Sequence, residues 1–434
     1  MTLDAAPSYI DRIAPDGHRT PMIAKIPPRP VVLALFAALT LGGAHAEPNA
    51  AGRDEAGLAP LELLGKRVFE DRNLSRPAGV ACASCHDPAK AFQGNNGSPI
   101  PAAARGSREG AFGARNTPTL TYSSFSPPFG FVDEKDEKTG KVEKIPVGGQ
   151  FLDGRAADLV QQFEGPLLNP DEMNMPSKRA VVEAIRGGPH ADLARRVLGE
   201  NVFADPDKAF ERIAQAVAAF ENTERFHPFT SKFDAYLKGE ARLTPLEARG
   251  FALFKDEKKG NCFACHVGKE GSRDPKDWLF TDFTYDTLGA PKNPALPATQ
   301  QPGAAPDLGL CRREGLAALA PKDFDIASVC GAFKVPTLRN VAVTGPYLHN
   351  GVFAKLRDVV AFYATRDTNP ERWYPKDATG ATRKFDDLPG KHRANVNAAE
   401  APYDRKPGQK PRLSEREIDA IVAFLETLTD LPGR

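Results

Sequence analysis

The first half of the chain contains the segment Cys82-Ala83-Ser84-Cys85-His86, and Cys262-Phe263-Ala264-Cys265-His266 repeats its pattern in the second half. Each segment offers two thiols that can form thioethers with the vinyl groups of a haem, and a histidine that reaches the iron from the same turn. A single copy could also be half of a zinc site or a redox dithiol. Two complete copies predict two covalently bound c-type haems, with His86 and His266 as the proximal iron ligands.

A similar apolar pattern precedes each of these motifs. Leu64-Gly65 with Val68-Phe69 leads into the first, and Arg249-Gly250 with Leu253-Phe254 leads into the second. Both have the spacing of an amphipathic helix. Thr244 and Pro245 suit the first positions of a new helix. We therefore predict two domains of related design, 58–239 and 240–434.

The rest of the chain reads as helices joined by long Pro- and Gly-rich segments. Helical patterns recur at 177–199, 206–222, 355–365 and 414–428. The charge run 133–144 has no apolar period and predicts a solvated loop. Strand signals are few and short. The predicted fold class is mostly α, with two cytochrome c-like domains, each around one covalent haem, and long irregular loops.

The N-terminus has the features of an export signal. Lys25 and Arg29 precede an apolar run over 31–41, and Ala44-His45-Ala46 is a suitable cleavage site, so we predict a signal peptide over 1–46, with Met22 as an alternative start. No segment is long and apolar enough for stable membrane insertion. The 57 Lys and Arg residues nearly balance the 56 Asp and Glu residues, which gives no reason to expect a nucleic acid partner. We expect a periplasmic protein.

Few side chains are available for the far side of each iron. Beyond the signal segment the only methionines are Met173 and Met175, and no histidine lies between His86 and His190. The loop after the first motif therefore cannot supply a histidine ligand, and we expect an open iron position there, where peroxide could bind. Cys311 and Cys330 are the remaining cysteines, and an exported protein favours a disulfide between them over two free thiols.

From Leu61 to Leu431 the chain resembles the diheme bacterial cytochrome c peroxidase/MauG superfamily. The resemblance rests on both haem motifs and on four further segments. These are Arg115-Asn116-Thr117-Pro118-Thr119, Asp153-Gly154-Arg155-Ala156, Asn169-Pro170-Asp171-Glu172-Met173, and Val335 to Asn340 followed by Pro346-Tyr347-Leu348-His349-Asn350-Gly351.

The resemblance implies roles for residues near the first haem, which is the peroxidatic one in that family. Gln162, Pro166 and Glu172 match the distal pocket, where Glu172 would be the general acid/base. Without the resemblance, Glu172 would look like a surface carboxylate in a turn.

Cofactor contacts are implied in the same way. A calcium ion between the haems would be bound by the Asn116 side chain and the carbonyls of Thr344 and Pro346, since oxygen donors suit this cation. Arg339 would pair with a haem propionate, although a structural salt bridge is the competing interpretation.

The chain also departs from the typical peroxidases of the family. Their loop histidine, which blocks the first haem until the second is reduced, is missing, so the resemblance implies no need for reductive activation. Their methionine ligand of the second haem is replaced by Tyr363, fourteen residues after His349, as in MauG-type proteins. Tyr363 also fits the apolar face of a helix and could be a core residue. Leu152 stands where the family usually has a tryptophan between the haems.

Three functions follow as hypotheses. The first is a MauG-like enzyme that reacts with hydrogen peroxide at the N-terminal haem and oxidises a partner protein. The second is a peroxidase that detoxifies hydrogen peroxide with electrons from a small cytochrome or cupredoxin. The third is an electron carrier without enzymatic activity. The family often forms dimers, so a homodimer is also an open alternative.

Overall fold

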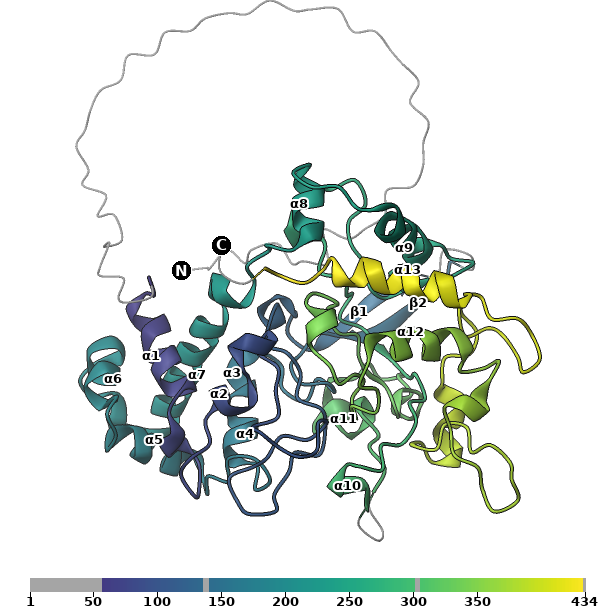
Figure 1. Cartoon of the computed structure of the whole chain (residues 1–434). Coiled ribbons are helices and arrows are strands. Elements are labelled where there is room, and N and C mark those ends of the chain that lie inside the picture. Colours follow the sequence, from purple (N-terminus) through teal and green to yellow (C-terminus); the bar gives the residue numbers. More distant parts are fainter. Residues whose placement is uncertain (1–56, 136–139, 301–304, 432–434) are drawn as a thin grey trace, which may run out of the picture. The chain divides into compact units, whose positions relative to one another are not determined.

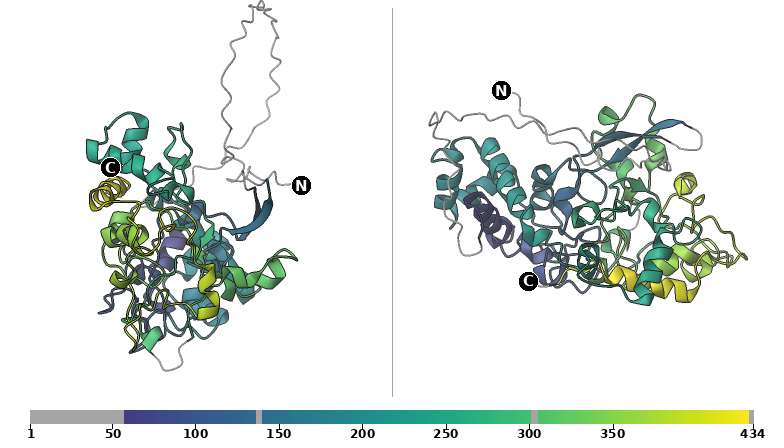
Figure 2. Two further views of the ribbon diagram at one scale, coloured as in Figure 1. Left: turned by 90° about the vertical axis from the view of Figure 1, so that its right-hand side faces the viewer. Right: turned by 90° about the horizontal axis from the view of Figure 1, so that it is seen from above.

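The computed structural model describes residues 57–135, 140–300 and 305–431. The predicted signal peptide and the alternative start at Met22 lie outside these residues. Long loops join the helices of the chain from Pro60 onward, and strands are short (Figure 1), as two further views also show (Figure 2). Apart from residues 58 and 59, both predicted domains lie in one compact unit that begins at Pro60, so the boundary between them stays a prediction.

The described residues are mostly helical or irregular, as predicted. The helices are α1 (Pro60–Phe69), α2 (Cys82–Cys85), α3 (Leu159–Gln162), α4 (Glu164–Leu168), α5 (Lys178–Arg186), α6 (Ala191–Leu198), α7 (Pro206–Glu221), α8 (Lys232–Lys238), α9 (Pro245–Lys255), α10 (Pro297–Gln300), α11 (Leu316–Leu319), α12 (Leu356–Thr365) and α13 (Glu415–Glu426). Two antiparallel pairs of strands accompany them: β1 (Gly130–Lys135) with β2 (Val142–Val147), and β3 (Tyr285–Asp286) with β4 (Phe333–Lys334).

A close helix pair stands ahead of the first haem motif. Helix α1 buries Leu64, Val68 and Phe69 and packs on α7. The two backbones approach so closely that a Cβ added at Gly65 would lie 1.9 Å from the carbonyl oxygen of Ala216. Only glycine leaves room for this contact.

The second haem motif has the same arrangement. Helix α9 packs on α13, the yellow helix beside it in Figure 1, and a Cβ added at Gly250 would lie 1.9 Å from the carbonyl oxygen of Ala420. Thr244 caps α9 through the backbone N–H of Glu247, and Pro245 is its first residue, as predicted. The two predicted helices ahead of the motifs are therefore confirmed, and they share one packing geometry.

Replacing Gly250 with alanine is expected to destabilise the protein by about 2 kcal/mol or more, because the new methyl group meets backbone that cannot rotate away. The midpoint of urea unfolding of the haem-loaded protein measures this loss. Gly390→Ala is the matched control, since a Cβ there meets nothing within 4 Å. Equal midpoints for the two variants would contradict the packing argument.

Two predicted elements differ in the structure. The expected helix over 177–199 is two helices, α5 and α6, because Gly187-Gly188-Pro189 interrupts it and proline lacks the N–H that a continuing helix needs. The expected solvated loop over 133–144 was wrong where the structure describes it. It contributes to the β1–β2 hairpin, in which Asp133 opposes Lys144 and their side chains form a 2.7 Å ion pair.

The predicted disulfide is confirmed. Cys311 and Cys330 are bonded, with 4.8 Å between their Cα atoms, and both pack in a small apolar cluster with Leu308 and Leu388. In the part of the chain that the structure describes, no helix has the length and apolar character needed to cross a membrane.

Candidate active site

The first haem motif forms a single turn of helix, α2. The backbone N–H of His86 donates to the carbonyl of Cys82 at 3.0 Å, which places the imidazole beside both thiols. The Nδ1 atom of His86 lies 2.9 Å from the carbonyl oxygen of Phe92. This contact fixes the ring with its Nε2 atom available for a metal. Burial lowers the pKa of His86 to about 4, so the imidazole is neutral, as a ligand must be.

The second motif repeats this geometry. The backbone N–H of His266 donates to the carbonyl of Cys262 at 2.9 Å, and its Nδ1 atom lies 3.0 Å from the carbonyl oxygen of Phe280. Burial lowers the pKa of His266 to about 4 as well. The four motif cysteines are unbridged, and burial raises the pKa of Cys85 and of Cys262 to about 12. Both pairs are therefore free of disulfides and can form thioethers with haem.

One cavity of about 1150 Å³ connects the two motifs. It is larger than the roughly 300–1,000 Å³ of a usual small-molecule pocket. Its walls include both cysteine pairs and both histidines. Of the other residues singled out in the sequence, Asn116, Gln162, Pro166, Glu172, Thr344, Pro346 and Tyr363 also line it. Donor chemistry and space therefore both fit two haems.

Three predicted residues come together on one wall of the cavity. Gln162 ends α3, Pro166 lies in α4, and Glu172 follows in the next turn. The Asn169 side chain donates from Nδ2 to Oε1 of Glu172 at 2.9 Å. Burial raises the pKa of Glu172, an effect that the nearby positive charge of Arg155 opposes. A raised pKa makes a buried carboxyl better suited to accept and return a proton than an ordinary carboxyl.

Tyr363 lies on α12 and lines the cavity with Cys262 and Cys265. Its ring makes an edge contact with Tyr403, at 5.7 Å between centroids. Burial raises the pKa of the Tyr363 phenol. A positive charge in the cavity, such as a metal ion, would favour loss of this proton.

Arg339 is placed differently from the expected propionate contact. Its Nη1 atom lies 2.7 Å from both carboxylate oxygens of Asp234, and the side chain is fully buried outside the cavity lining. Nε and Nη2 donate to the carbonyls of Trp278 and Pro275. The structural salt bridge, which was the competing interpretation, describes Arg339, and the expectation of a propionate partner is corrected.

The three residues expected to bind calcium lie at the same cavity. The Asn116 side chain donates from Nδ2 to the carbonyl of Pro346 at 2.6 Å and to that of Leu348 at 3.3 Å. Thr344, two positions before Pro346, also lines the cavity. Asn116 is thus in contact with one of its two expected partners.

Similarity to known proteins identifies the family of this chain. A family model described as di-haem cytochrome c peroxidase matches residues 60–242. The methylamine utilization protein MauG of Paracoccus denitrificans is 38% identical over 373 residues, which cover 85% of this chain and 88% of that protein. The chain belongs to the di-haem cytochrome c peroxidase/MauG family.

Two further members of the di-haem peroxidase family are similar to this chain. The cytochrome c551 peroxidase of Nitrosomonas europaea is 30% identical, with 70% of this chain and 72% of that protein covered. The crystal structure of the diheme peroxidase BthA from Burkholderia thailandensis superposes with a TM-score of 0.77 at 41% identity, covering 85% of this chain and 86% of that one. The chain accordingly carries two covalent haems and is an oxidoreductase that acts on peroxide, and the electron carrier hypothesis is set aside.

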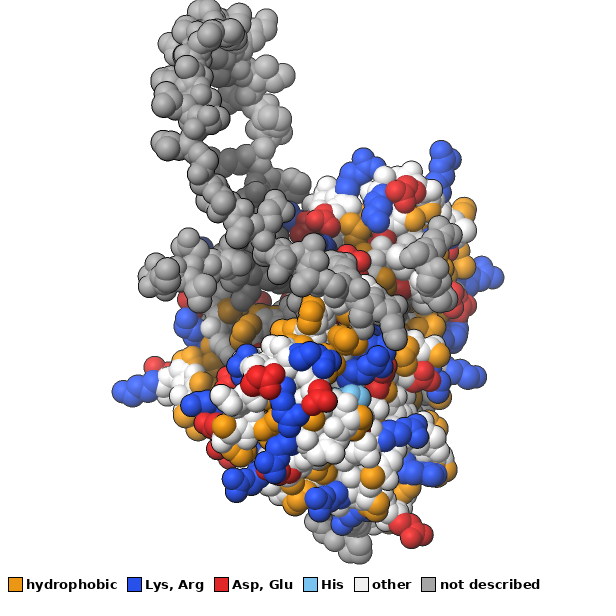
Figure 3. All heavy atoms as spheres, turned by 90° about the vertical axis from the view of Figure 1, so that its left-hand side faces the viewer, with side chains coloured by type: hydrophobic (Ala, Val, Ile, Leu, Met, Phe, Trp, Pro, Cys, Tyr) orange, Lys and Arg blue, Asp and Glu red, His pale blue; other side chains and the backbone are white. Residues whose placement is uncertain are grey.

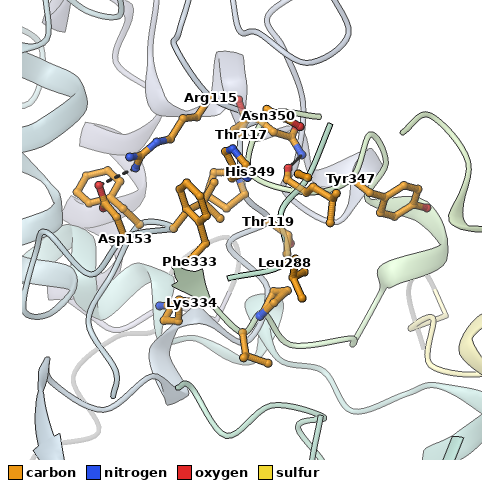
Figure 4. Close-up of a pocket in the computed structure, with 18 of the residues that line it drawn as sticks. Arg115, Thr117, Thr119, Asp153, Leu288, Phe333, Lys334, Tyr347, His349 and Asn350 are labelled. Atoms are coloured by element: carbon orange, nitrogen blue, oxygen red, sulfur yellow. Dashed lines mark hydrogen bonds and ion pairs between the residues drawn. The ribbon is translucent and has the colours of Figure 1, made fainter. Parts of the chain in front are cut away.

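Sequence reasoning missed how one wall of this di-haem peroxidase is assembled (Figure 4). The Phe333 ring stacks on His349 with 3.8 Å between centroids and 8° between planes. Arg115 approaches the Phe333 ring to 5.4 Å and donates from Nη1 to Asp153 at 2.6 Å. Arg115, Asp153 and His349 stand in the segments that carry the family resemblance, but no pattern of spacing indicated their contacts.

Proposed function

We propose that this enzyme is MauG-like: hydrogen peroxide reacts at the N-terminal haem, and a partner protein is oxidised through the C-terminal haem. The observation that carries this choice is Tyr363 beside Cys262 and Cys265 in the cavity. No methionine follows Met175 in the sequence. An anionic phenolate favours oxidised iron more than a neutral thioether does, which suits storage of oxidising equivalents. The similarity of this chain to proteins named MauG supports the same choice.

The first pocket would handle the protons of the reaction. Peroxide takes up two protons and two electrons and leaves as two water molecules, so the partner must lose two electrons. The carboxylate of Glu172 would accept a proton from one peroxide oxygen and return it to the other, as general acid/base catalysis requires. Gln162 and Pro166 would shape the space in which peroxide is held.

Mixing the ferric protein with hydrogen peroxide in the absence of any electron donor tests the proposal. We expect a two-electron-oxidised species that persists for much longer than the mixing time. Absorption and EPR spectroscopy monitor its formation and decay. Immediate bleaching of the haem absorption in the wild-type protein, with the same time course in Tyr363→Phe, would contradict the proposal.

The second candidate is a peroxidase that removes hydrogen peroxide with electrons from a small cytochrome or cupredoxin. Its support is the 30% identity to the cytochrome c551 peroxidase of Nitrosomonas europaea. On the face seen in Figure 3, Lys and Arg side chains are interspersed with Asp and Glu, so charge there favours neither a strongly acidic nor a strongly basic donor. Rapid steady-state turnover with reduced cytochrome c would favour this function over the first.

We also propose the setting in which the enzyme works. Residues 1–46 would direct export to the periplasm, where thioether and disulfide formation are compatible with the environment. Residues 58–239 would form the domain of the peroxidatic haem and 240–434 the domain of the electron-transfer haem. A homodimer is an open alternative, and size-exclusion chromatography with light scattering decides it.

Removal of calcium is expected to slow peroxide turnover, because the proposed site joins Asn116 to the carbonyls of Thr344 and Pro346 at the shared cavity. Dialysis against EGTA, followed by metal analysis and an activity assay, measures the effect, and added calcium should restore the rate. Asn116→Ala should bind calcium more weakly, while Asn96→Ala is the control. Full activity in protein that retains no calcium would contradict the proposal.

A further inference from the structure

Phe151 lies against the wall that carries Gln162, Pro166 and Glu172. Its backbone has φ +63°, in the left-handed region that residues with a Cβ seldom adopt. A Cβ added at Gly165 would lie 2.6 Å from the Cζ atom of the Phe151 ring. The ring therefore fills the space that glycine leaves, next to Pro166, and it lines the cavity.

Arg155 lies over the face of this ring. Its guanidinium carbon is 3.5 Å from the ring centroid of Phe151, a cation–π contact. Its Nη1 atom donates to Oδ1 of Asp153 at 2.9 Å. Asp153 is itself fixed, because it is buried and accepts a second bond, from Arg115. The Phe151 ring and the Asp153 carboxylate thus hold the Arg155 guanidinium in one orientation.

The guanidinium keeps donors to spare. Arginine carries five N–H donors. Within the described residues, Nε and Nη2 of Arg155 have no hydrogen-bonded protein partner. The side chain is 40% exposed and lines the cavity together with Phe151, Gln162, Pro166 and Glu172. Its charge also acts on Glu172, where it favours the ionised carboxylate.

We propose that Arg155 is a further residue of the peroxide site, and that its free donors bind the hydroperoxide anion formed when peroxide gives a proton to Glu172. The proton balance is simple: H₂O₂ and the Glu172 carboxylate become HOO⁻ and the protonated carboxyl. A fixed cation stabilises this anion through charge-assisted hydrogen bonds. Phe151 positions the cation. This inference rests on the proposed reaction of peroxide at the first haem.

Azide binding to the ferric haem-loaded protein tests the proposal without relying on turnover. Azide is a small anionic iron ligand, and its dissociation constant follows from an optical titration. Hydrogen bonds to a charged group are stronger than those between neutral groups, so Arg155→Gln is expected to weaken azide binding roughly 10- to 100-fold. Arg155→Lys should retain part of the affinity. Arg186→Gln removes an exposed arginine on α5 that does not line the cavity, and it should bind azide like the wild type.

A neutral ligand separates charge from packing. Imidazole binding should change by no more than about twofold in Arg155→Gln, because a neutral ligand does not need the cation. Unchanged azide affinity in Arg155→Gln, or an equal loss of azide and imidazole affinity, would overturn the role of Arg155 and leave the proposed function standing. A wild-type protein that binds no azide at the first haem would overturn the proposed function itself, and this inference with it.

Discussion

Replacement of Glu172 with glutamine is expected to slow the reaction of the ferric enzyme with hydrogen peroxide by a factor of about 10²–10⁴, the usual contribution of general acid/base catalysis. Glutamine keeps the shape and can still contact Asn169, whose Nδ2 atom lies 2.9 Å from Oε1 of Glu172. It cannot take up a proton. Stopped-flow absorption at increasing peroxide concentration gives the second-order rate constant.

The pH dependence of that rate constant identifies the group. Burial raises the pKa of Glu172 above its ordinary value of 4.5. Because only the carboxylate accepts a proton, the wild-type rate should fall as the pH drops through this raised pKa. In Glu172→Gln this decline should vanish. Glu164→Gln is the control, since Glu164 pairs with Lys178 at 2.7 Å and does not line the cavity. A slower variant with the wild-type pH profile would assign the proton transfer to another group.

Replacement of Tyr363 with methionine is expected to raise the reduction potential of the second haem by on the order of 0.1 V, within the range of about 0.8 V that axial ligands span. A neutral thioether stabilises ferric iron less than an anionic phenolate does. Tyr363→Phe should leave the second iron without this ligand and change its EPR signal. Spectroelectrochemical titration measures the potentials of the two haems separately.

A buried tyrosine nearby provides the control for this prediction. Tyr374 donates its hydroxyl to the carbonyl of Gly289 at 2.6 Å and does not line the cavity. Tyr374→Phe removes only this hydroxyl and its hydrogen bond, and both potentials should stay as in the wild type. If Tyr363→Phe also leaves the potential and the EPR signal unchanged, Tyr363 is a core residue of α12, the other interpretation of its helical spacing.

Local chemistry made much of the architecture predictable. The two CxxCH segments, the cap at Thr244 and the helical spacing ahead of each motif depend on residues a few positions apart, and the structure agrees with them. The disulfide followed from the compartment and from the count of cysteines. Gln162, Glu172 and Tyr363 were found through family resemblance, and the structure places all three at the cavity, while their roles stay predictions.

Contacts between distant residues were not predictable in the same way. The partner of Arg339 is Asp234, 105 positions away, and no local pattern distinguishes that carboxylate from a haem propionate. The β1–β2 hairpin contains one cross-strand pair of opposite charge, Asp133 with Lys144, which a single polar run does not reveal. The approach of Gly250 to Ala420 likewise became visible only when both helices were placed.

The helix pair at Gly250 has a consequence for the order in which the chain folds. Lys255 ends α9 and Glu415 begins α13, so the two helices are separated by 160 positions (415 minus 255). Contacts between such distant segments form slowly, because the long intervening loop must close first. During synthesis from the N-terminus, α13 is the last of the described helices to emerge. Until α13 docks, the segment that carries Cys262 and Cys265 lacks part of its packing, because a Cβ added at the neighbouring Gly260 would lie 3.3 Å from Ile421 of α13.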